Sequence, residues 1–352
     1  MTKEQKVSIL LLNWNGISYT KHCVESLLML DYSNYEIIVL DNGSDNNEAE
    51  ILDKKFSKNK KIRIIKNGRN IGYAAGMNKA FTFAQGKYVL VTNNDMRFEK
   101  DYLTQLVRVL KENPKIAICQ PKLKNLQDKD MFDYSIAAGG HMDLFGYLFA
   151  RGRIFTFVEK DKGQYDTLAK ISWCGIFLAR KNVLEKTGLF DPIYFNYGED
   201  GDLCFRIYGQ GYIIVNNPKA VGYHISGGAM KKNLYKKMFF HHRNNVILIL
   251  KNFPTRWLLL IIFPRIFLDF VAIFYYLYRG SPNSSLAVLG AYVSLIRLSK
   301  KIWRARKKVQ PILIKSNLSA MPVYKGCIIY DFFIRGKETF AQIMIDKSLI
   351  KL

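Results

Sequence analysis

Hydrophobic and polar positions alternate in blocks along the first 95 residues of the chain. Short apolar, often β-branched runs are typical of buried strands, whereas apolar residues spaced three or four apart are typical of helices that cover a sheet. Turns rich in Gly, Asn and Asp separate these blocks. The pattern predicts strands within 6–15, 35–41 and 88–92, helices within 18–30 and 46–58, and a strand, a glycine-rich turn and a helix within 61–86.

This alternation predicts an α/β domain with a largely parallel sheet and helices on both of its faces. Ser18 is expected to cap the first helix. Ligands of such sheets bind at the carboxyl ends of the strands. Three predicted strands lead into Asn13, Asp41 and Asp95, so polar side chains are expected to converge on one edge of the sheet.

Three polar patterns each have a simple structural explanation beside a functional one. The triplet Asn93–Asp95 is also typical of a turn. The acidic run Glu199–Asp202 precedes a predicted helix, where carboxylates also suit the positive end of the helix dipole, and Asp202 can pair with Arg206 along it. His224 ends a later predicted strand, where a lone histidine is more often a satisfied strand-end residue than a ligand.

The charge of the chain is concentrated at its C-terminal end. The net charge is +24, and residues 226–352 contain 22 Lys and Arg but only 4 Asp and Glu. Such an excess indicates an acidic partner. The aromatic residues of this part fall in apolar runs rather than between cations, which favours an anionic lipid surface and argues against nucleic acid.

The most apolar stretch, Trp257–Tyr278, has the length of one bilayer crossing. It contains Arg265 and Asp269, which share one helix face and could neutralise each other. Even when paired, ionisable residues at mid-depth cost about 2.5–3.5 kcal/mol each. The next apolar stretch, Ser284–Ile296, is short for a span. We expect a hairpin of amphipathic helices in the cytoplasmic leaflet, with a two-span hairpin as the alternative. The expected division is a catalytic domain in 1–225, basic membrane-associated helices in 226–310 and a closing helical segment in 311–352.

The cysteines and the N-terminus bear on the compartment. Five cysteines are scattered without a Cys-x-x-Cys pair, which fits a reducing compartment. The chain passes from a short polar start directly into a predicted strand, so no signal peptide is expected.

Six segments in order make the chain resemble the family 2 glycosyltransferases of the GT-A fold, in particular their rhamnosyltransferase-like branch. Each motif is short, but six in register over about 220 residues are specific. The resemblance implies a Rossmann-like nucleotide-diphospho-sugar transferase fold, here followed by a membrane-associated helical region. The motifs are "SILLLNWNG", "IIVLDNGSDN", "KNGRNIGYAAGMNKA", "YVLVTNNDM", "GIFLARKNVLEKTGLFDPIYFNYGEDGDLCFRIYGQGY" and "GYHISGG".

The resemblance also implies a metal site. In the family, an Asp-x-Asp motif at a strand tip holds a divalent cation on the pyrophosphate of the donor. Here Asn93 stands where the first Asp often occurs, so Asp95 is left as the only charged ligand of the triplet. His224 falls where a second protein ligand can occur, and the expected cofactor is Mn²⁺ or Mg²⁺, with an imidazole favouring Mn²⁺.

The implied donor is a pyrimidine nucleotide sugar, a UDP- or dTDP-sugar, whose base Asp41 is expected to bind. The small residues after Asn70 also fit simple close packing of a helix on a strand. A cation at a helix start also explains Arg243 without a ligand. The other residues expected at the donor are Asn13, Asn15, Ser44, Asn70, Gly72, Tyr73, Asn93, Asn94 and Arg243.

Asp200 is the expected general base, because an inverting transfer needs a carboxylate to deprotonate the acceptor hydroxyl; Glu199 is the second candidate. The resemblance and the apolar, basic C-terminal part together predict a metal-dependent enzyme at the cytoplasmic face of the cell membrane, with a lipid-linked saccharide as acceptor. Two alternatives stay open. One is a polyprenyl-phosphate hexose synthase, which needs no base for a hydroxyl, and the other is a non-catalytic nucleotide-sugar-binding membrane protein.

Overall fold

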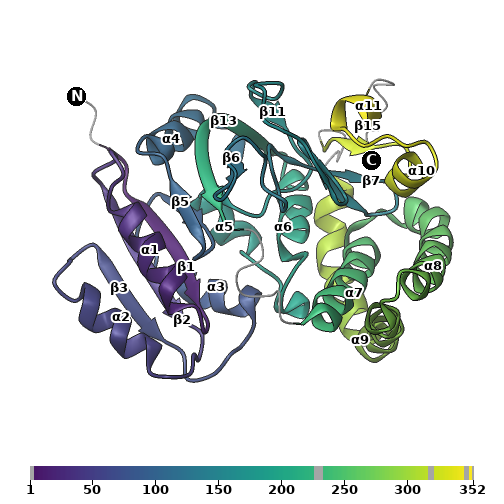
Figure 1. Cartoon of the computed structure of the whole chain (residues 1–352), viewed down its shortest axis with the longest axis horizontal. Coiled ribbons are helices and arrows are strands. Elements are labelled where there is room, and N and C mark those ends of the chain that lie inside the picture. The colour runs from purple at the N-terminus through teal and green to yellow at the C-terminus, as the bar shows by residue number, and fades with distance from the viewer. Residues whose placement is uncertain (1–3, 226–232, 316–320, 345–348, 351–352) are drawn as a thin grey trace.

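The computed structural model describes residues 4–225, 233–315, 321–344 and 349–350 (Figure 1). The expected glycine-rich loop after His224 lies mostly outside these residues. The main sheet occupies the N-terminal two thirds of the chain, and three long helices lie beyond it at the opposite end of the molecule (Figure 1).

The main sheet has nine strands in the order β11-β13-β6-β12-β4-β1-β2-β3, with β5 paired to β13. Its strands are β1 (Val7–Asn13), β2 (Tyr35–Asp41), β3 (Ile62–Lys66), β4 (Tyr88–Val91), β5 (Met96–Phe98), β6 (Ile116–Asn125), β11 (Ala169–Lys170), β12 (Phe177–Arg180) and β13 (Ile213–His224). Its helices are α1 (Ile17–Leu27), α2 (Glu48–Phe56), α3 (Tyr73–Phe81), α4 (Tyr102–Glu112), α5 (Lys181–Thr187), the 3₁₀ turn η1 (Pro192–Tyr194) and α6 (Glu199–Tyr208).

The predicted strand–helix alternation is confirmed for the first 91 residues. Strands β1, β2, β3 and β4 are mutually parallel, and α1 and α3 pack on β1 while α3 also contacts β2. Apolar side chains of β1, β2 and β4 form much of the main core, and those of β3 are partly buried against it. Strand β12 then enters antiparallel to β4 and β6, so the complete sheet is mixed. The expected cap at Ser18 is wrong, because α1 begins at Ile17 and Gly16 occupies the cap position.

A smaller sheet joins distant parts of the sequence, and it was not predicted. Its strands are in the order β10-β9-β8-β7-β14-β15. β14 comes from the C-terminal segment and pairs in parallel with β7. The strands are β7 (Gly140–Asp143), β8 (Leu148–Ala150), β9 (Arg153–Ile154), β10 (Phe157–Val158), β14 (Val323–Tyr324) and β15 (Leu349–Ile350).

The predicted boundary near residue 225 coincides with the end of β13, and the helices that follow pack against the sheet domain. Leu248 and Ile249 of α7, and Phe253 directly after it, belong to the main hydrophobic core. The second apolar stretch, Ser284–Ile296, and the cation-rich residues 297–308 that follow it lie on one 34-residue helix, α9. These C-terminal helices are α7 (Leu234–Asn252), α8 (Thr255–Tyr278), α9 (Pro282–Lys315), α10 (Ile328–Phe333) and α11 (Phe340–Met344).

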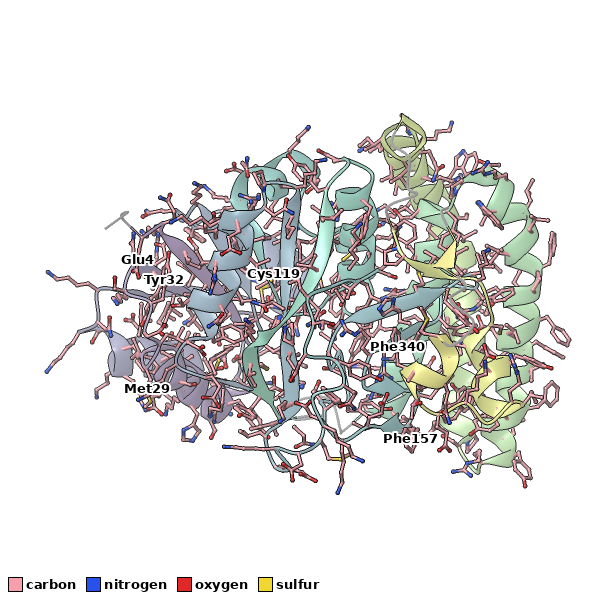
Figure 2. All side chains as sticks on the ribbon, turned by 90° about the horizontal axis from the view of Figure 1, so that it is seen from above. Glu4, Met29, Tyr32, Cys119, Phe157 and Phe340 are labelled. Atoms are coloured by element: carbon pink, nitrogen blue, oxygen red, sulfur yellow. The ribbon has the colours of Figure 1, made fainter. Side chains whose placement is uncertain are left out.

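Among the described residues, α8 is the one helix that is long and apolar enough to cross a membrane. One face carries exposed apolar side chains along its whole length, and aromatic rings project from it away from the rest of the molecule (Figure 2). Arg265 and Asp269 lie on the opposite face, fully buried and paired at 3.2 Å. His242, Tyr292 and the carbonyl of Phe145 complete this buried cluster.

Candidate active site

The carboxyl ends of β1 and β2 form a buried polar cluster. Asn13 lies opposite Asp41 in the parallel register, and Asn13 Nδ2 donates to Asp41 Oδ2 at 2.7 Å. Ser44 closes the turn by donating its backbone N–H to Asp41 Oδ1, and the Ser44 hydroxyl accepts the backbone N–H of Asn15. Glu48, at the start of α2, accepts a hydrogen bond from Asn13 as well. Asp41, Asn13, Asn15 and Ser44, all expected at the donor, are thus brought together.

The triplet after β4 is linked to this cluster through α1. Asn94 Nδ2 donates to the Thr20 hydroxyl, and Thr20 donates to Asn13 Oδ1 at 2.6 Å. The carbonyl of Asn93 accepts a hydrogen bond from the thiol of Cys23. Asn94 is therefore directed toward α1, where it connects the two strand tips.

The loop before α3 is held by an asparagine that sequence reasoning missed. Asn42 donates to Asn70 Oδ1 and to the carbonyl of Gly72, and it accepts the N–H of Ile71. Gly72 has φ +86°, and a Cβ there would meet the backbone oxygen of Phe195 at 2.7 Å. The glycine is required because a second loop packs directly on this turn.

Asp95 lies beside His224 because β5 directly follows Asp95 and places Met96 opposite His224 on β13. Asp95 Oδ1 is 3.0 Å from His224 Nε2, close enough for an ion pair although the geometry is not that of a hydrogen bond. On the other side of the ring, Nδ1 lies 2.9 Å from the fully buried Asp133. Burial disfavours the charged ring, but the charge of Asp133, its hydrogen bond and nearby Asp95 outweigh it and raise the pKa of His224 to about 10.

Within the described parts of the chain, no three His, Cys, Asp or Glu side chains are arranged as a complete metal site. A cation at the Asp95–His224 pair could complete its shell with oxygen ligands such as those of phosphate or water.

Tyr73 lies close enough to both Asp95 and the start of α6 to be influenced by the charges at both places. Burial raises the pKa of Tyr73 well above its usual value, and the charges of Glu199, Asp200 and Asp95 raise it further. Burial also raises the pKa of Asp200 to about 6. For Glu199, burial and then the charge of Asp200 raise the pKa well above the usual range. Asp200 is thus the carboxylate that ionises first near neutral pH.

The loop that leads to these carboxylates is held in an unusual backbone conformation. Phe195 has φ 62° and Tyr197 has φ 68°, a region that costs about 1–3 kcal/mol for residues other than glycine. Asn244 Nδ2, on α7, lies within hydrogen-bond distance of the carbonyls of Tyr194, Asn196 and Tyr197, at 3.0, 2.8 and 2.6 Å. This buried amide was not predicted from the sequence, and it offsets the strain of the loop.

Arg243, expected at the donor pyrophosphate, is almost fully buried in contact with the same loop. It donates to the carbonyls of Tyr194 and Ile193 and to Asn244 Oδ1. The guanidinium also lies over the ring of Phe240, 4.9 Å from its centroid. Its contact with a pyrophosphate stays a prediction, while its contact with the loop is direct.

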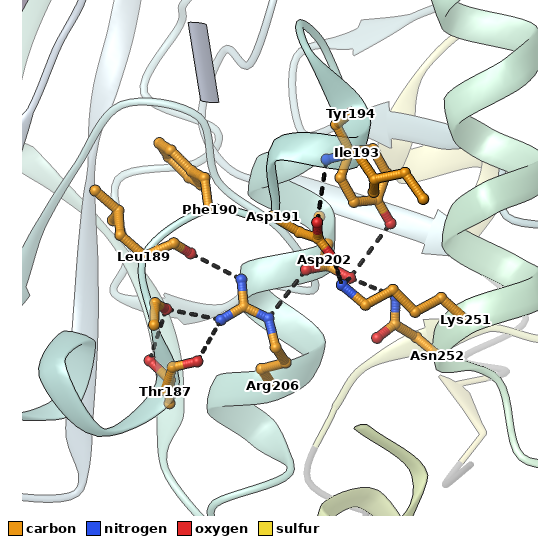
Figure 3. A network of polar contacts seen from close by, with 12 residues as sticks. Thr187, Leu189, Phe190, Asp191, Ile193, Tyr194, Asp202, Arg206, Lys251 and Asn252 are labelled. Atoms are coloured by element: carbon orange, nitrogen blue, oxygen red, sulfur yellow. Dashed lines mark hydrogen bonds and ion pairs between the residues drawn. The ribbon is translucent and has the colours of Figure 1, made fainter. Parts of the chain in front are cut away.

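Asp202 lies on the side of α6 opposite to Asp200, and it is the centre of a buried ion network (Figure 3). It pairs with Arg206 Nε at 2.9 Å and Lys251 Nζ at 2.8 Å, and it accepts hydrogen bonds from Tyr194 and Asn252. Arg206 also donates to three carbonyls at the end of α5 and in the loop that follows it. The network fixes α6 to α7 and to the loop that leads to the carboxylates.

The mixed sheet with its flanking helices has the GT-A fold. A mannosyltransferase from Pyrobaculum calidifontis, solved in complex with GDP-Man and Mn²⁺, superposes with a TM-score of 0.52 at 14% identity, over 89% of this chain and 86% of that one. The family model of glycosyl transferase family 2 matches residues 8–188. The chain belongs to this family, and it is a family 2 glycosyltransferase.

Curated relatives agree with the family. Glycosyltransferase GlyA of Streptococcus pneumoniae is 25% identical over 237 residues, which cover 66% of this chain and 32% of the relative. A poly-beta-1,6-N-acetyl-D-glucosamine synthase of Staphylococcus epidermidis is 27% identical over 174 residues, 46% of this chain and 42% of the relative. The chain thus spans less than half the length of these relatives. The rhamnosyltransferase-like branch stays a prediction.

Proposed function

We propose that this chain is an inverting, metal-dependent glycosyltransferase that moves a sugar from a pyrimidine nucleotide sugar to a lipid-linked glycan. The observation that carries the proposal is the Asp95–His224 pair, which lies at the strand tips between the Asp41 cluster and the carboxylates of α6. Donor, cation and base would then occupy one continuous edge of the sheet.

The donor atoms fit a divalent cation. The carboxylate oxygen of Asp95 and the imidazole nitrogen of His224 are 3.0 Å apart. Two neighbouring ligands of a small divalent cation, each about 2.1 Å from it, would have about this separation. The hydrogen bond that the other ring nitrogen, Nδ1–H, would donate to Asp133 would fix the ring orientation, as carboxylates behind metal-bound histidines do. Once bound, Mn²⁺ or Mg²⁺ would neutralise charge on the donor diphosphate. Asp95 and His224 would hold it.

The base and ribose would bind at the cluster around Asp41. Asp41 and Glu48 are both buried acceptors bound to Asn13, so this pocket is suited to the N–H donor of a pyrimidine. Asn15 and Ser44 would line its outer edge. Tyr73 and Gly72 would lie against the ribose or diphosphate.

Asp200 would act as the base. Its oxygen takes the proton of the acceptor hydroxyl while the hydroxyl oxygen forms a bond to the anomeric carbon from the face opposite the nucleotide. The anomeric C–O bond to the diphosphate breaks, the diphosphate leaves with the electron pair, and the configuration inverts. A pKa of about 6 keeps Asp200 ionised at neutral pH, whereas burial and the charge of Asp200 hold the pKa of Glu199 well above its usual range.

The acceptor would be presented by the cytoplasmic leaflet of the cell membrane. The exposed face of α8 is apolar from Leu259 to Tyr278, with Arg256 and Arg279 at its two ends. The charged residues in the middle of the helix, Arg265 and Asp269, are buried against the protein, and the helix packs on α7 and α9 along one side. This geometry favours a helix that lies in the interface over one that crosses the bilayer.

The test is a transfer and hydrolysis assay with purified protein in detergent and Mn²⁺, against UDP-, dTDP- and GDP-sugars and a polyprenyl-diphosphate-linked saccharide. We expect metal-dependent turnover of one pyrimidine donor that is lost in Asp95→Ala. Turnover onto polyprenyl phosphate at a near-normal rate in Asp200→Asn would instead favour the hexose synthase. Absence of any donor binding would refute the proposal.

A further inference from the structure

A basic cleft lies on the far side of α6 from the proposed base. It has a volume of about 420 Å³ and opens between α9 and the loop that joins α5 to η1. We define the basic cleft by the five cations that line it. They are Arg206, Lys251, Lys301, Arg304 and Lys308.

The cations of the basic cleft form two layers. Arg206 and Lys251 form its floor, buried and already paired with Asp202. The other three come from one face of α9, because they are spaced three and four residues apart, and their side chains are exposed. In the described part of the chain, these three form no ion pair with a carboxylate. Asp191, which is bound to Lys251, is the only acidic residue among those that line the cleft. A cavity with this excess of cations is suited to an anion.

The same face of α9 changes character along its length. Toward the N-terminal end it exposes Leu286, Leu289 and Val293, all about half exposed. Three- and four-residue steps continue this face through Arg297 into the cations of the cleft. The apolar part lies next to α8, because the hydroxyl of Ser285 donates to a carbonyl of α8. The opening of the cleft therefore lies where an apolar surface gives way to a basic one, which is the arrangement expected at the level of lipid headgroups.

We propose that the basic cleft binds the phosphate headgroup of an anionic glycerophospholipid. This inference rests on the proposed membrane location of α8. The phosphate would bind between Arg304 and the two lysines of the rim, above Arg206. Because α6 separates the cleft from Asp200, this lipid is distinct from the acceptor, and it would hold the enzyme in a fixed orientation on the membrane.

The experiment measures flotation of the full chain with vesicles at about 0.15 M salt. The vesicles contain phosphatidylcholine alone or with one fifth phosphatidylglycerol. The cleft variant carries Lys301→Gln, Arg304→Gln and Lys308→Gln. We expect the wild type to prefer the anionic vesicles and the cleft variant to lose this preference. A single variant, Ala305→Glu, places a carboxylate in the cleft wall and should have the same effect.

The matched control removes the same charge from the same helix outside the cleft, with Arg297→Gln, Lys300→Gln and Lys307→Gln. If only general attraction to an anionic surface were at work, both triple variants would lose equal affinity for the anionic vesicles. We expect the cleft variant to lose at least about tenfold more affinity than the control. Equal losses would overturn the headgroup site while leaving the membrane location intact.

Two further outcomes separate the remaining explanations. Displacement of the wild type from the anionic vesicles by millimolar inorganic phosphate would show a site for a soluble anion and overturn the lipid assignment. Failure of the wild type to bind any vesicle would overturn the membrane location together with the headgroup site.

Discussion

Replacing Asp202 with Asn should destabilise the protein far more than an exposed charge substitution does. Burial alone would raise the pKa of Asp202, but the charges of Lys251 and Arg206 outweigh it and lower the pKa from 3.8 to about 2. At about 1.4 kcal/mol per pKa unit, this difference in pKa corresponds to about 2 kcal/mol. Removing one partner of a buried ion pair typically costs about 3–5 kcal/mol, because the other charge stays buried and unpaired. We expect the free energy of unfolding to fall by between about 2 and about 5 kcal/mol.

The assay is denaturant unfolding in detergent, followed by tryptophan fluorescence. Asp191→Asn is the matched control, because Asp191 pairs with the same Lys251 but is 26% exposed, and its loss should stay below about 1 kcal/mol. The contribution of Asp202 is present above about pH 4 and is lost as the pH falls through about 2, because the folded pKa is the lower one. A loss under about 1 kcal/mol in Asp202→Asn would refute the argument that this network fixes α6.

Three other predictions concern the candidate site. Asp133→Asn should weaken Mn²⁺ binding in the presence of nucleotide diphosphate by about 10–100-fold, measured by calorimetry, because His224 loses the partner that orients it; unchanged affinity would show that Asp133 has no such role. Gly72→Ala should cost more than about 1 kcal/mol of unfolding free energy, since φ is +86° and the turn is packed. Gly68→Ala, with open space around it, is the control and should be near neutral. The value of kcat/KM should rise with pH through about 6 as Asp200 ionises, and a flat profile from pH 5 to 8 would exclude it as the base.

The parallel half of the sheet was predictable because its signals are local. Each of the first strands is a short apolar run that leads into a polar residue, so Asn13 and Asp41 could be placed at the same edge of the sheet before the register was known. The parallel arrangement then requires their side chains to meet at one edge.

The remainder depends on contacts between residues far apart in the chain. Asp133 approaches His224 across 91 residues, and nothing in the local sequence around Asp133 indicates such a partner. Asn244 binds carbonyls about fifty residues earlier in the chain. The two-residue strand β14 is too short for a periodic signal and is defined only by its pairing with β7.

The C-terminal helices were partly predictable. The length of the apolar run predicted a long helix at the position of α8, and the four-residue spacing of Arg265 and Asp269 predicted that the two would pair. The fusion of two stretches into α9 was missed, since the change from apolar to basic residues resembles a boundary although the helical spacing continues through it.

The most direct test of the central claim is calorimetric binding of the donor nucleotide diphosphate, with and without Mn²⁺, to the wild type, Asp95→Asn and Asp200→Asn. The account predicts Mn²⁺-dependent binding by the wild type, at least about tenfold weaker binding by Asp95→Asn, and unchanged binding without transfer by Asp200→Asn. Equal affinity of the wild type and Asp95→Asn in Mn²⁺ would contradict it, because the cation would then be held elsewhere.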